Sequence, residues 1–320
     1  MRTNEKGILV KGAIVTAVVT LAALGARAAK PVPPTWLGAM AAAEQEAPDA
    51  DEAAEAAPSK PIPLDIGVEY TLVSDYVWRG MNFSEYAGER GERCNNQMNV
   101  SASYDTGTCG SINASIWFEW FSGQKAMDPA SDGYLQEVDY TLSWSYDIEP
   151  CGLGVEAGVI FYHFPQSEGD AANTLEWFVG LSFDDSKLFG TEEPVLNPTV
   201  TYYYDVDLVK GGQWLEFGIS HDFALADLGC DVPIVKDLTI TPSATLGLSH
   251  RYWTESTKLG NLLLGLSASY DLGKAIGMDP KCGSLSLTGF LNYSQALGIE
   301  DDVPGYNDEF FGGVTIGYGW

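Results

Sequence analysis

Apolar side chains occupy every second position along most of the chain from Leu64 onward. The first such segment places Leu64, Ile66, Val68, Tyr70 and Leu72 on one face and Asp65, Gly67, Glu69 and Thr71 on the other. A period of two is typical of β-strands, because successive side chains point to opposite faces. About twelve such segments follow one another, each near the roughly 9–11 residues that a tilted strand needs to cross a bilayer. The pattern predicts an all-β chain.

The positions between the apolar ones are mostly small and polar. In three later segments they are Ser101 and Ser103, then Thr141, Ser143 and Ser145, then Thr239, Thr241, Ser243 and Thr245. A barrel of twelve strands is too wide for the apolar set to be its core and the small polar set its surface. In a membrane barrel the apolar set meets lipid and the polar set lines a water-filled lumen. We therefore expect a transmembrane antiparallel up-and-down β-barrel over residues 64–320, in preference to a soluble β-sandwich.

Aromatic residues are expected near both ends of the strands, at the level of the lipid headgroups. If the first strand runs outward from the periplasm, the alternation assigns Trp78, Trp120, Trp177 and Tyr252 to the external rim. The same rule assigns Tyr104, Tyr146, Tyr270 and Trp320 to the periplasmic rim. The final segment, with Tyr318 and Trp320 on its apolar face, also resembles the carboxy-terminal signal that the barrel assembly machinery recognises in bacterial outer-membrane barrels.

The first 63 residues have a different composition. Arg2, Lys6 and Lys11 precede or begin an apolar run of about 14 residues that ends before Ala26-Arg27-Ala28, whereas a spanning helix needs about 20 apolar residues. This layout predicts a cleaved secretory signal peptide over residues 1–28. Residues 29–63 are rich in Pro, Ala and acidic side chains, which predicts a disordered periplasmic linker. We expect the mature protein in the bacterial outer membrane, in contact with its lipids.

The chain is acidic, with a formal net charge of −27, which argues against a nucleic-acid partner. The alternation places most of the strand carboxylates on the lumen side. They include Asp65, Glu69, Asp139, Glu156, Glu176, Asp205 and Glu216. Rings of acidic side chains favour cations over anions. The sequence therefore predicts a cation-preferring lumen, and it predicts no cofactor and no metal site.

Five cysteines are present. In the expected topology, Cys109, Cys151, Cys230 and Cys282 fall in or beside periplasmic turns, and Cys94 lies in the first external loop. An exported chain meets an oxidising compartment, so disulfides are compatible with this placement. We expect the pairs Cys109–Cys151 and Cys230–Cys282, while reduced thiols or other pairings stay open because spacing does not fix connectivity.

The run from Ser74 to Gly80, Ser-Asp-Tyr-Val-Trp-Arg-Gly, is followed by Met81-Asn82-Phe83-Ser84. This segment resembles the first-strand motif of TorF-type porins, a family of similar size and strand number. The resemblance implies a porin-like channel and names no solute. On a continuous strand, Asp75 and Arg79 would share the lumen face. Arg79 would then narrow the pore, pair with a lumen carboxylate, or form a structural ion pair at the base of the first loop.

The pattern thus predicts a passive channel for small solutes or cations. Two other classes stay open. A structural or adhesin-like barrel need not conduct, and the external loop Phe83–Asn96 is long enough to block the lumen. An outer-membrane lipid hydrolase needs a serine close to a histidine. His163, His221 and His250 do not stand in the His-x-Ser pattern of that family, so we do not expect an enzyme.

Overall fold

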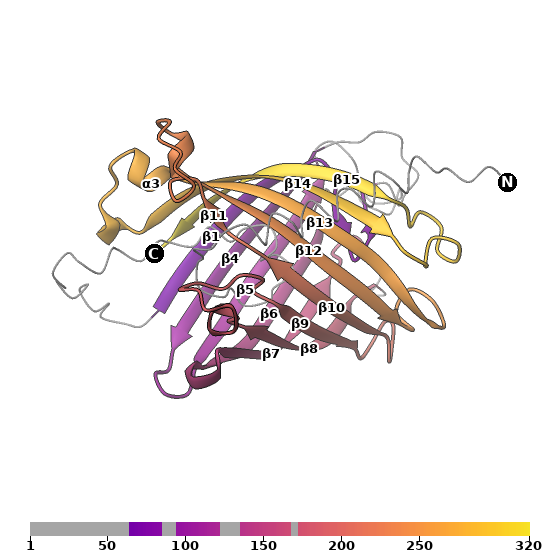
Figure 1. Cartoon of the computed structure of the whole chain (residues 1–320). Helices are drawn as coiled ribbons and strands as arrows, with labels where there is room; N and C mark the ends of the chain where they lie inside the picture. Colours follow the sequence, from indigo (N-terminus) through magenta and orange to yellow (C-terminus); the bar gives the residue numbers. More distant parts are fainter. Residues whose placement is uncertain (1–63, 85–93, 122–134, 168–171) are drawn as a thin grey trace.

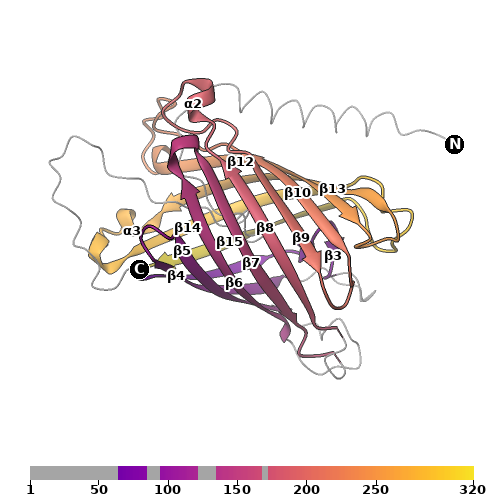
Figure 2. The same cartoon turned by 90° about the horizontal axis from the view of Figure 1, so that it is seen from below.

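The structure, a computed structural model, describes residues 64–84, 94–121, 135–167 and 172–320. The predicted signal peptide and linker lie outside these residues. Twelve long antiparallel strands form one sheet that closes on itself, as predicted. Each strand pairs with its neighbours in sequence (Figures 1 and 2), which gives an up-and-down barrel.

The strands match the segments of period two. The twelve long strands are β1 (Leu64–Val73), β4 (Asn95–Asp105), β5 (Ser111–Phe121), β6 (Leu135–Ile148), β7 (Leu153–His163), β8 (Thr174–Phe183), β9 (Thr199–Asp205), β10 (Gln213–Ser220), β12 (Leu238–His250), β13 (Thr257–Asp271), β14 (Ser284–Ala296) and β15 (Glu309–Gly319). The short elements are β2 (Val77–Trp78), β3 (Met81–Asn82), β11 (Phe223–Ala224), η1 (Glu149–Cys151), α2 (Ser186–Phe189), η3 (Val235–Asp237), α3 (Leu272–Ala275) and η4 (Pro280–Cys282). The end of the barrel where β1 begins is called the helix end, because α2 and α3 lie there, and the opposite end is called the hairpin end.

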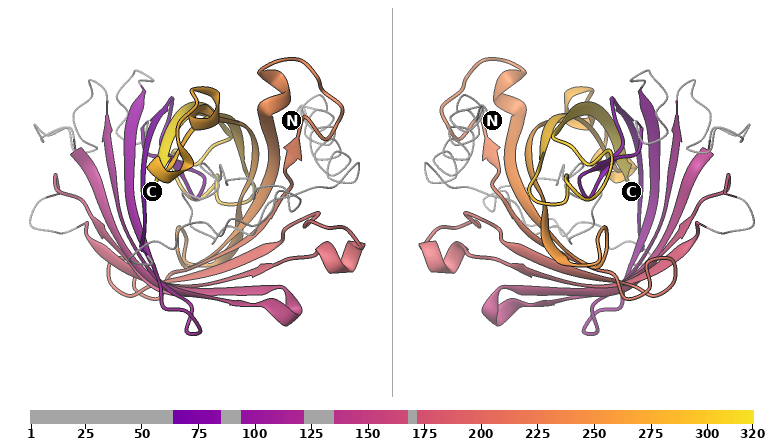
Figure 3. Two further views of the ribbon diagram at one scale, coloured as in Figure 1. Left: turned by 90° about the vertical axis from the view of Figure 1, so that its left-hand side faces the viewer. Right: turned by 90° about the vertical axis from the view of Figure 1, so that its right-hand side faces the viewer.

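The first and last long strands close the barrel. β1 pairs with β15 in a register that sets Val68 opposite Tyr318. Ile66 and Trp320 exchange two backbone hydrogen bonds of 2.8 Å. The predicted assembly-signal residues therefore lie at the helix end of this seam. Seen along its axis, the barrel is a ring of strands around an interior that parts of the chain enter (Figure 3).

The outer face of the barrel is apolar, as the alternation predicts. Among its exposed side chains, Leu142 is 55 % exposed, Trp177 60 % and Phe310 67 %. The alternating positions face inward, so the polar side chains predicted for the lumen lie inside. Tyr104, Tyr146 and Trp320 are exposed at the helix end, as predicted for a rim. None of the helices in the described ranges is long and apolar enough to span a membrane.

Two of the predicted rim aromatics are placed differently. Trp78 and Tyr252 lie inside the barrel, where Tyr252 is buried and Trp78 packs against the same cluster of rings. Both come after the end of a strand, β1 or β12, so the alternation of that strand no longer fixes the direction of their side chains.

The predicted disulfides are absent, because all five cysteines are thiols in the structure. Cys109, Cys151 and Cys282 are exposed, and Cys230 is half-buried. The Cys151 thiol donates to the carbonyl oxygen of Ile148 at 3.3 Å, within its own turn. Neighbouring turns thus do not by themselves bring the sulfur atoms together, since a disulfide needs Cα atoms within about 7 Å and aligned Cβ vectors.

Candidate functional site inside the barrel

The chain turns into the barrel directly after β1. Ser74 still bonds the wall through its N–H and the carbonyl of Gly312 at 2.9 Å. Beyond it, β2 and β3 form a small antiparallel hairpin of their own, and Phe83 N–H donates to the carbonyl of Tyr76 at 2.8 Å. Residues 74–84 are called the plug hairpin. The expectation that Asp75 and Arg79 share a face of one strand is therefore wrong, because β1 ends at Val73.

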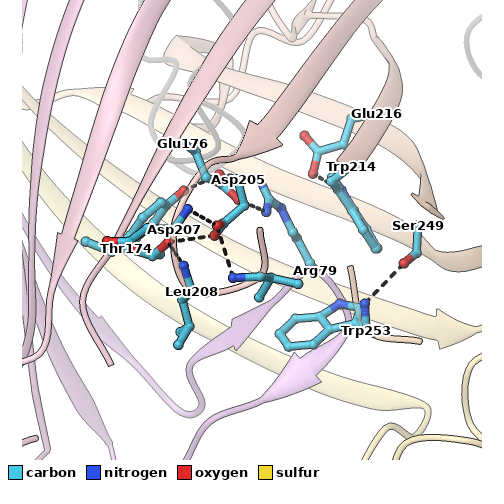
Figure 4. A network of polar contacts seen from close by, with 12 residues as sticks. Arg79, Thr174, Glu176, Asp205, Asp207, Leu208, Trp214, Glu216, Ser249 and Trp253 are labelled. Carbon is cyan, nitrogen blue, oxygen red and sulfur yellow. Dashed lines mark hydrogen bonds and ion pairs between the residues drawn. The ribbon is translucent and has the colours of Figure 1, made fainter. Parts of the chain in front are cut away.

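Arg79 stands at the tip of the plug hairpin and is buried. Its backbone has a φ of 48°, and Gly80 follows with a φ of 83°. The guanidinium donates two parallel hydrogen bonds to Glu176 of β8, at 2.7 Å to Oε1 and 2.9 Å to Oε2 (Figure 4). Such a forked pair fixes the position of both groups. Pairing with a lumen carboxylate, one of the three predicted roles for Arg79, is present in the structure.

Four aromatic rings surround the same guanidinium. The distances from Arg79 Cζ to the ring centroids are 4.4 Å for Tyr203, 4.5 Å for Trp78, 4.7 Å for Tyr252 and 5.6 Å for Trp214. These four rings are called the cage. A cation within about 6 Å of an aromatic face is attracted by the ring quadrupole, more strongly where water is excluded.

Hydrogen bonds hold the surroundings of the guanidinium in place. The Tyr162 hydroxyl donates to Glu176 Oε2 at 2.8 Å, and Trp214 Nε1 donates to Glu216 Oε1 at 2.8 Å. The Tyr306 hydroxyl, from the β14–β15 connection, donates to the backbone oxygen of Arg79 at 2.7 Å. A Cβ added at Gly80 would lie 2.2 Å from that hydroxyl oxygen, so only glycine fits there without a shift.

The rest of the plug hairpin packs into the wall. The Tyr76 ring packs against Trp117 in a tilted arrangement with centroids 5.4 Å apart, and its hydroxyl donates to Glu137 Oε2 at 2.9 Å. Asn82 donates from its amide to Asp75 Oδ1 at 3.3 Å. Met81 is fully buried in one apolar cluster with Ile299, Tyr306 and wall residues. Side chains therefore fill the hairpin end of the lumen.

Burial shifts the acid–base behaviour of the residues that close this end. It raises the pKa of Tyr76 well above its usual range, and the neighbouring Glu137 carboxylate adds to the effect. Burial also raises the pKa of Tyr252, against the opposing charge of Arg79. Burial by itself lowers the pKa of Arg79, but the Glu176 carboxylate raises it, and the net effect is a pKa well above the usual value. The guanidinium therefore stays charged.

Carboxyl groups outnumber cations at the hairpin end. Glu119, Glu137, Asp139, Glu176 and Asp205 are all buried, and Arg79 is the only lysine or arginine among the buried residues of the described chain. Asp205 accepts hydrogen bonds from the Thr174 hydroxyl at 2.7 Å and the Asp207 N–H at 2.9 Å (Figure 4). Within the described ranges, neither oxygen of Glu119 has a hydrogen-bond partner. Unpaired buried charge is costly, so this region attracts cations or protons.

The helix end of the lumen is different in character. Its wall consists mainly of small hydroxyl side chains, among them Ser101, Thr141, Thr241 and Thr245. Asp65 is exposed there, and Glu69 is half-buried. Glu156 is buried against the wall and accepts a hydrogen bond from the Ser143 hydroxyl at 2.6 Å. The predicted lumen acids thus form two groups, one at the helix end that ranges from exposed Asp65 to buried Glu156, and a buried one around the plug hairpin.

The three histidines do not meet. His163 Nδ1 lies 3.2 Å from Asn173 Oδ1, His250 Nδ1 lies 2.5 Å from Thr257 Oγ1, and the His221 ring packs on Phe223 with centroids 4.4 Å apart. His221 is buried. In the described ranges, no group of three His, Cys, Asp or Glu side chains could hold a metal ion.

Sequence reasoning found Arg79, Glu176 and Glu216 as inward positions but did not bring them together. It missed Tyr306 and the inward direction of Trp78 and Tyr252. A local signal was present at Gly80, because an isolated glycine inside a strand-like run indicates a bend or a close approach of the backbone. The partners of that turn come from strands and connections about a hundred residues or more away, such as Glu176 at 97 positions and Tyr306 at 227, which no local pattern reveals.

No protein-family model matches this sequence, and no curated protein matches it. Solved structures with a related fold include the NanC porin, at 14 % identity and a TM-score of 0.40 over 80 % of this chain and 98 % of that one. The KdgM porin shows 11 % identity and a TM-score of 0.42 over 79 % and 98 % of the two chains. The COG4313 outer membrane channel from Pseudomonas putida F1 shows 10 % identity and a TM-score of 0.44 over 82 % and 97 %. Likenesses this distant assign no family and no solute to the chain.

Proposed function

We propose that this protein is a porin-like channel of the bacterial outer membrane, with the hairpin end facing outward and the plug hairpin closing it. The observation that carries the proposal is the reversal of polarity across the wall. The outside of a closed twelve-stranded barrel is apolar, whereas the inside carries hydroxyl and carboxyl side chains besides the aromatic and apolar cluster around the plug hairpin. That arrangement is stable in lipid and unfavourable in water, because the exposed side chains would form a continuous apolar surface in contact with solvent.

Small solutes enter the helix end, where the wall carries hydroxyl groups and carboxylates. Asp65 and Glu69 give this vestibule a negative charge, which supports a preference for cations. Passage to the other side requires the plug hairpin to leave its place, because packed side chains fill the lumen around it. The resemblance of residues 74–84 to the first-strand motif of TorF-type porins supports the proposal of a porin-like channel.

Planar-bilayer recordings of the purified protein under a salt gradient test the proposal. We expect rare openings whose reversal potential has the sign of cation selectivity. Openings that favour anions would refute the predicted cation preference, while the proposal of a channel would stand.

The packed plug favours a second candidate, a structural barrel that never conducts. A variant that lacks residues 76–83, with the ends of the gap joined by a short Gly-Ser linker, separates the two. A channel is expected to conduct steadily without its plug. A folded barrel that stays silent after the deletion would establish the structural role.

A further inference from the structure

Glu176 and three of the four cage rings belong to the barrel and not to the plug hairpin. Glu176 lies on β8, Tyr203 on β9 and Trp214 on β10, and Tyr252 lies in the β12–β13 connection. Only Trp78 belongs to the hairpin itself. The wall therefore presents one carboxylate and three rings toward a cation, and in the closed barrel that cation is the Arg79 guanidinium of the plug hairpin.

These groups keep their arrangement through bonds that do not involve Arg79. Tyr162 orients the Glu176 carboxylate, and Glu216 holds the indole of Trp214. A site whose groups are held in advance loses little conformational freedom when a ligand binds. Withdrawal of the hairpin would leave a preformed receptor open to the lumen.

The geometry selects one chemical class of ligand. Two parallel N–H groups of Arg79 meet the two oxygens of Glu176, and flat faces meet the rings. A planar guanidinium satisfies both demands at once, whereas an ammonium group is a compact point charge that cannot donate two parallel bonds from one plane. The neighbouring Asp205 and Glu216 add negative charge to the region, which raises the local concentration of cations.

We infer that the barrel wall around Glu176, Tyr203, Trp214 and Tyr252 is a binding site for solutes that carry a guanidinium group. Arg79 is the tethered occupant that fills this site in the closed state. A guanidinium solute from the lumen competes with Arg79, and its binding releases the plug hairpin. This inference rests on the proposed channel function for its physiological meaning, but the binding itself does not require conduction.

Isothermal titration calorimetry in detergent tests the binding, with methylguanidinium as the probe and propylammonium as the matched ammonium control. The Arg79→Ala protein, whose site is vacated, is expected to bind methylguanidinium about tenfold more tightly than the wild type does. It is also expected to prefer methylguanidinium to propylammonium. Adding Glu176→Gln to Arg79→Ala removes the charged fork and is expected to abolish this preference.

Equal affinity of the Arg79→Ala protein for the two cations would overturn the inference, and so would equal affinity for methylguanidinium with and without Glu176→Gln. If Arg79→Ala does not fold, Arg79→Lys serves in its place, because a lysine leaves the fork unmade. Its affinity for methylguanidinium must then exceed that of the wild type, and failure to do so refutes the site. Bilayer recordings on the same proteins report conduction separately, so a silent barrel that binds methylguanidinium would refute only the channel.

Discussion

Replacing Gly80 with alanine is expected to loosen the plug hairpin. Gly80 has a φ of +83°, where an L-residue costs about 1–2 kcal/mol. The added Cβ would also lie 2.2 Å from the hydroxyl oxygen of Tyr306 and 2.5 Å from its Cζ. Tyr306 must therefore move, and it is buried to 1 % exposure. Its hydrogen bond to Arg79 O is then lost, and that oxygen stays buried without a donor.

Gly305 provides the matched control, because its φ is +85° and a Cβ there meets nothing within 4 Å. Gly305→Ala carries the backbone cost alone. The lost hydrogen bond and the displaced ring add about 2 kcal/mol to Gly80→Ala, which corresponds to a roughly thirtyfold larger population of undocked hairpin than in the control.

Trypsin reads this population directly, because Arg79 is buried when the hairpin is docked. Cleavage after Arg79, followed by mass spectrometry, tracks the open population when closing is faster than cutting. The rate is expected to rise far more in Gly80→Ala than in Gly305→Ala, and channel openings are expected to rise with it. In a Tyr306→Ala background the excess should vanish, since the obstructing ring is gone. Equal cleavage rates in Gly80→Ala and Gly305→Ala would refute the packing argument.

Three further outcomes are expected. Neutralising the vestibule with Asp65→Asn and Glu69→Gln should move the reversal potential under a salt gradient toward zero, whereas Asp231→Asn, in an exposed turn at the helix end, should leave it unchanged. An unchanged potential in the double variant would place selectivity elsewhere. Leu142→Arg, on the apolar outer face, should destabilise the barrel in lipid by about 2–4 kcal/mol, and Thr141→Arg, facing the lumen, should cost much less in the same urea titration. Similar costs would contradict the assignment of faces. Alkylation without reductant should label Cys109, Cys151, Cys230 and Cys282 as thiols. Unlabelled pairs would restore the disulfides that the sequence predicts.

The wall of the barrel could be predicted from the sequence because successive side chains of a pleated strand point to opposite faces, so the alternation of apolar and polar residues identifies each strand. Each strand from β1 to β15 either pairs with its sequence neighbour or closes the ring, so no long-range choice had to be guessed. The residues that fill the lumen could not be predicted from this alternation. The sequence predicts that Asp75 and Arg79 continue the strand of β1, yet the chain leaves the wall after Ser74. Trp78 therefore points into the lumen, where it packs with Tyr252 of the β12–β13 connection, and only the folded chain shows that Arg79 meets Glu176.

The plug is assembled from segments that are far apart in the chain, and this has a consequence for the order of folding. The hydrogen bond from Tyr306 to Arg79 O joins residues 227 positions apart. Contacts of such separation form late, because a long loop must close before they contribute. The wall can therefore form around an interior that is still unfilled, and the plug hairpin settles last. Changes at Gly80 or Arg79 are then expected to alter how fast the barrel opens and unfolds, and to leave the rate at which it forms nearly unchanged.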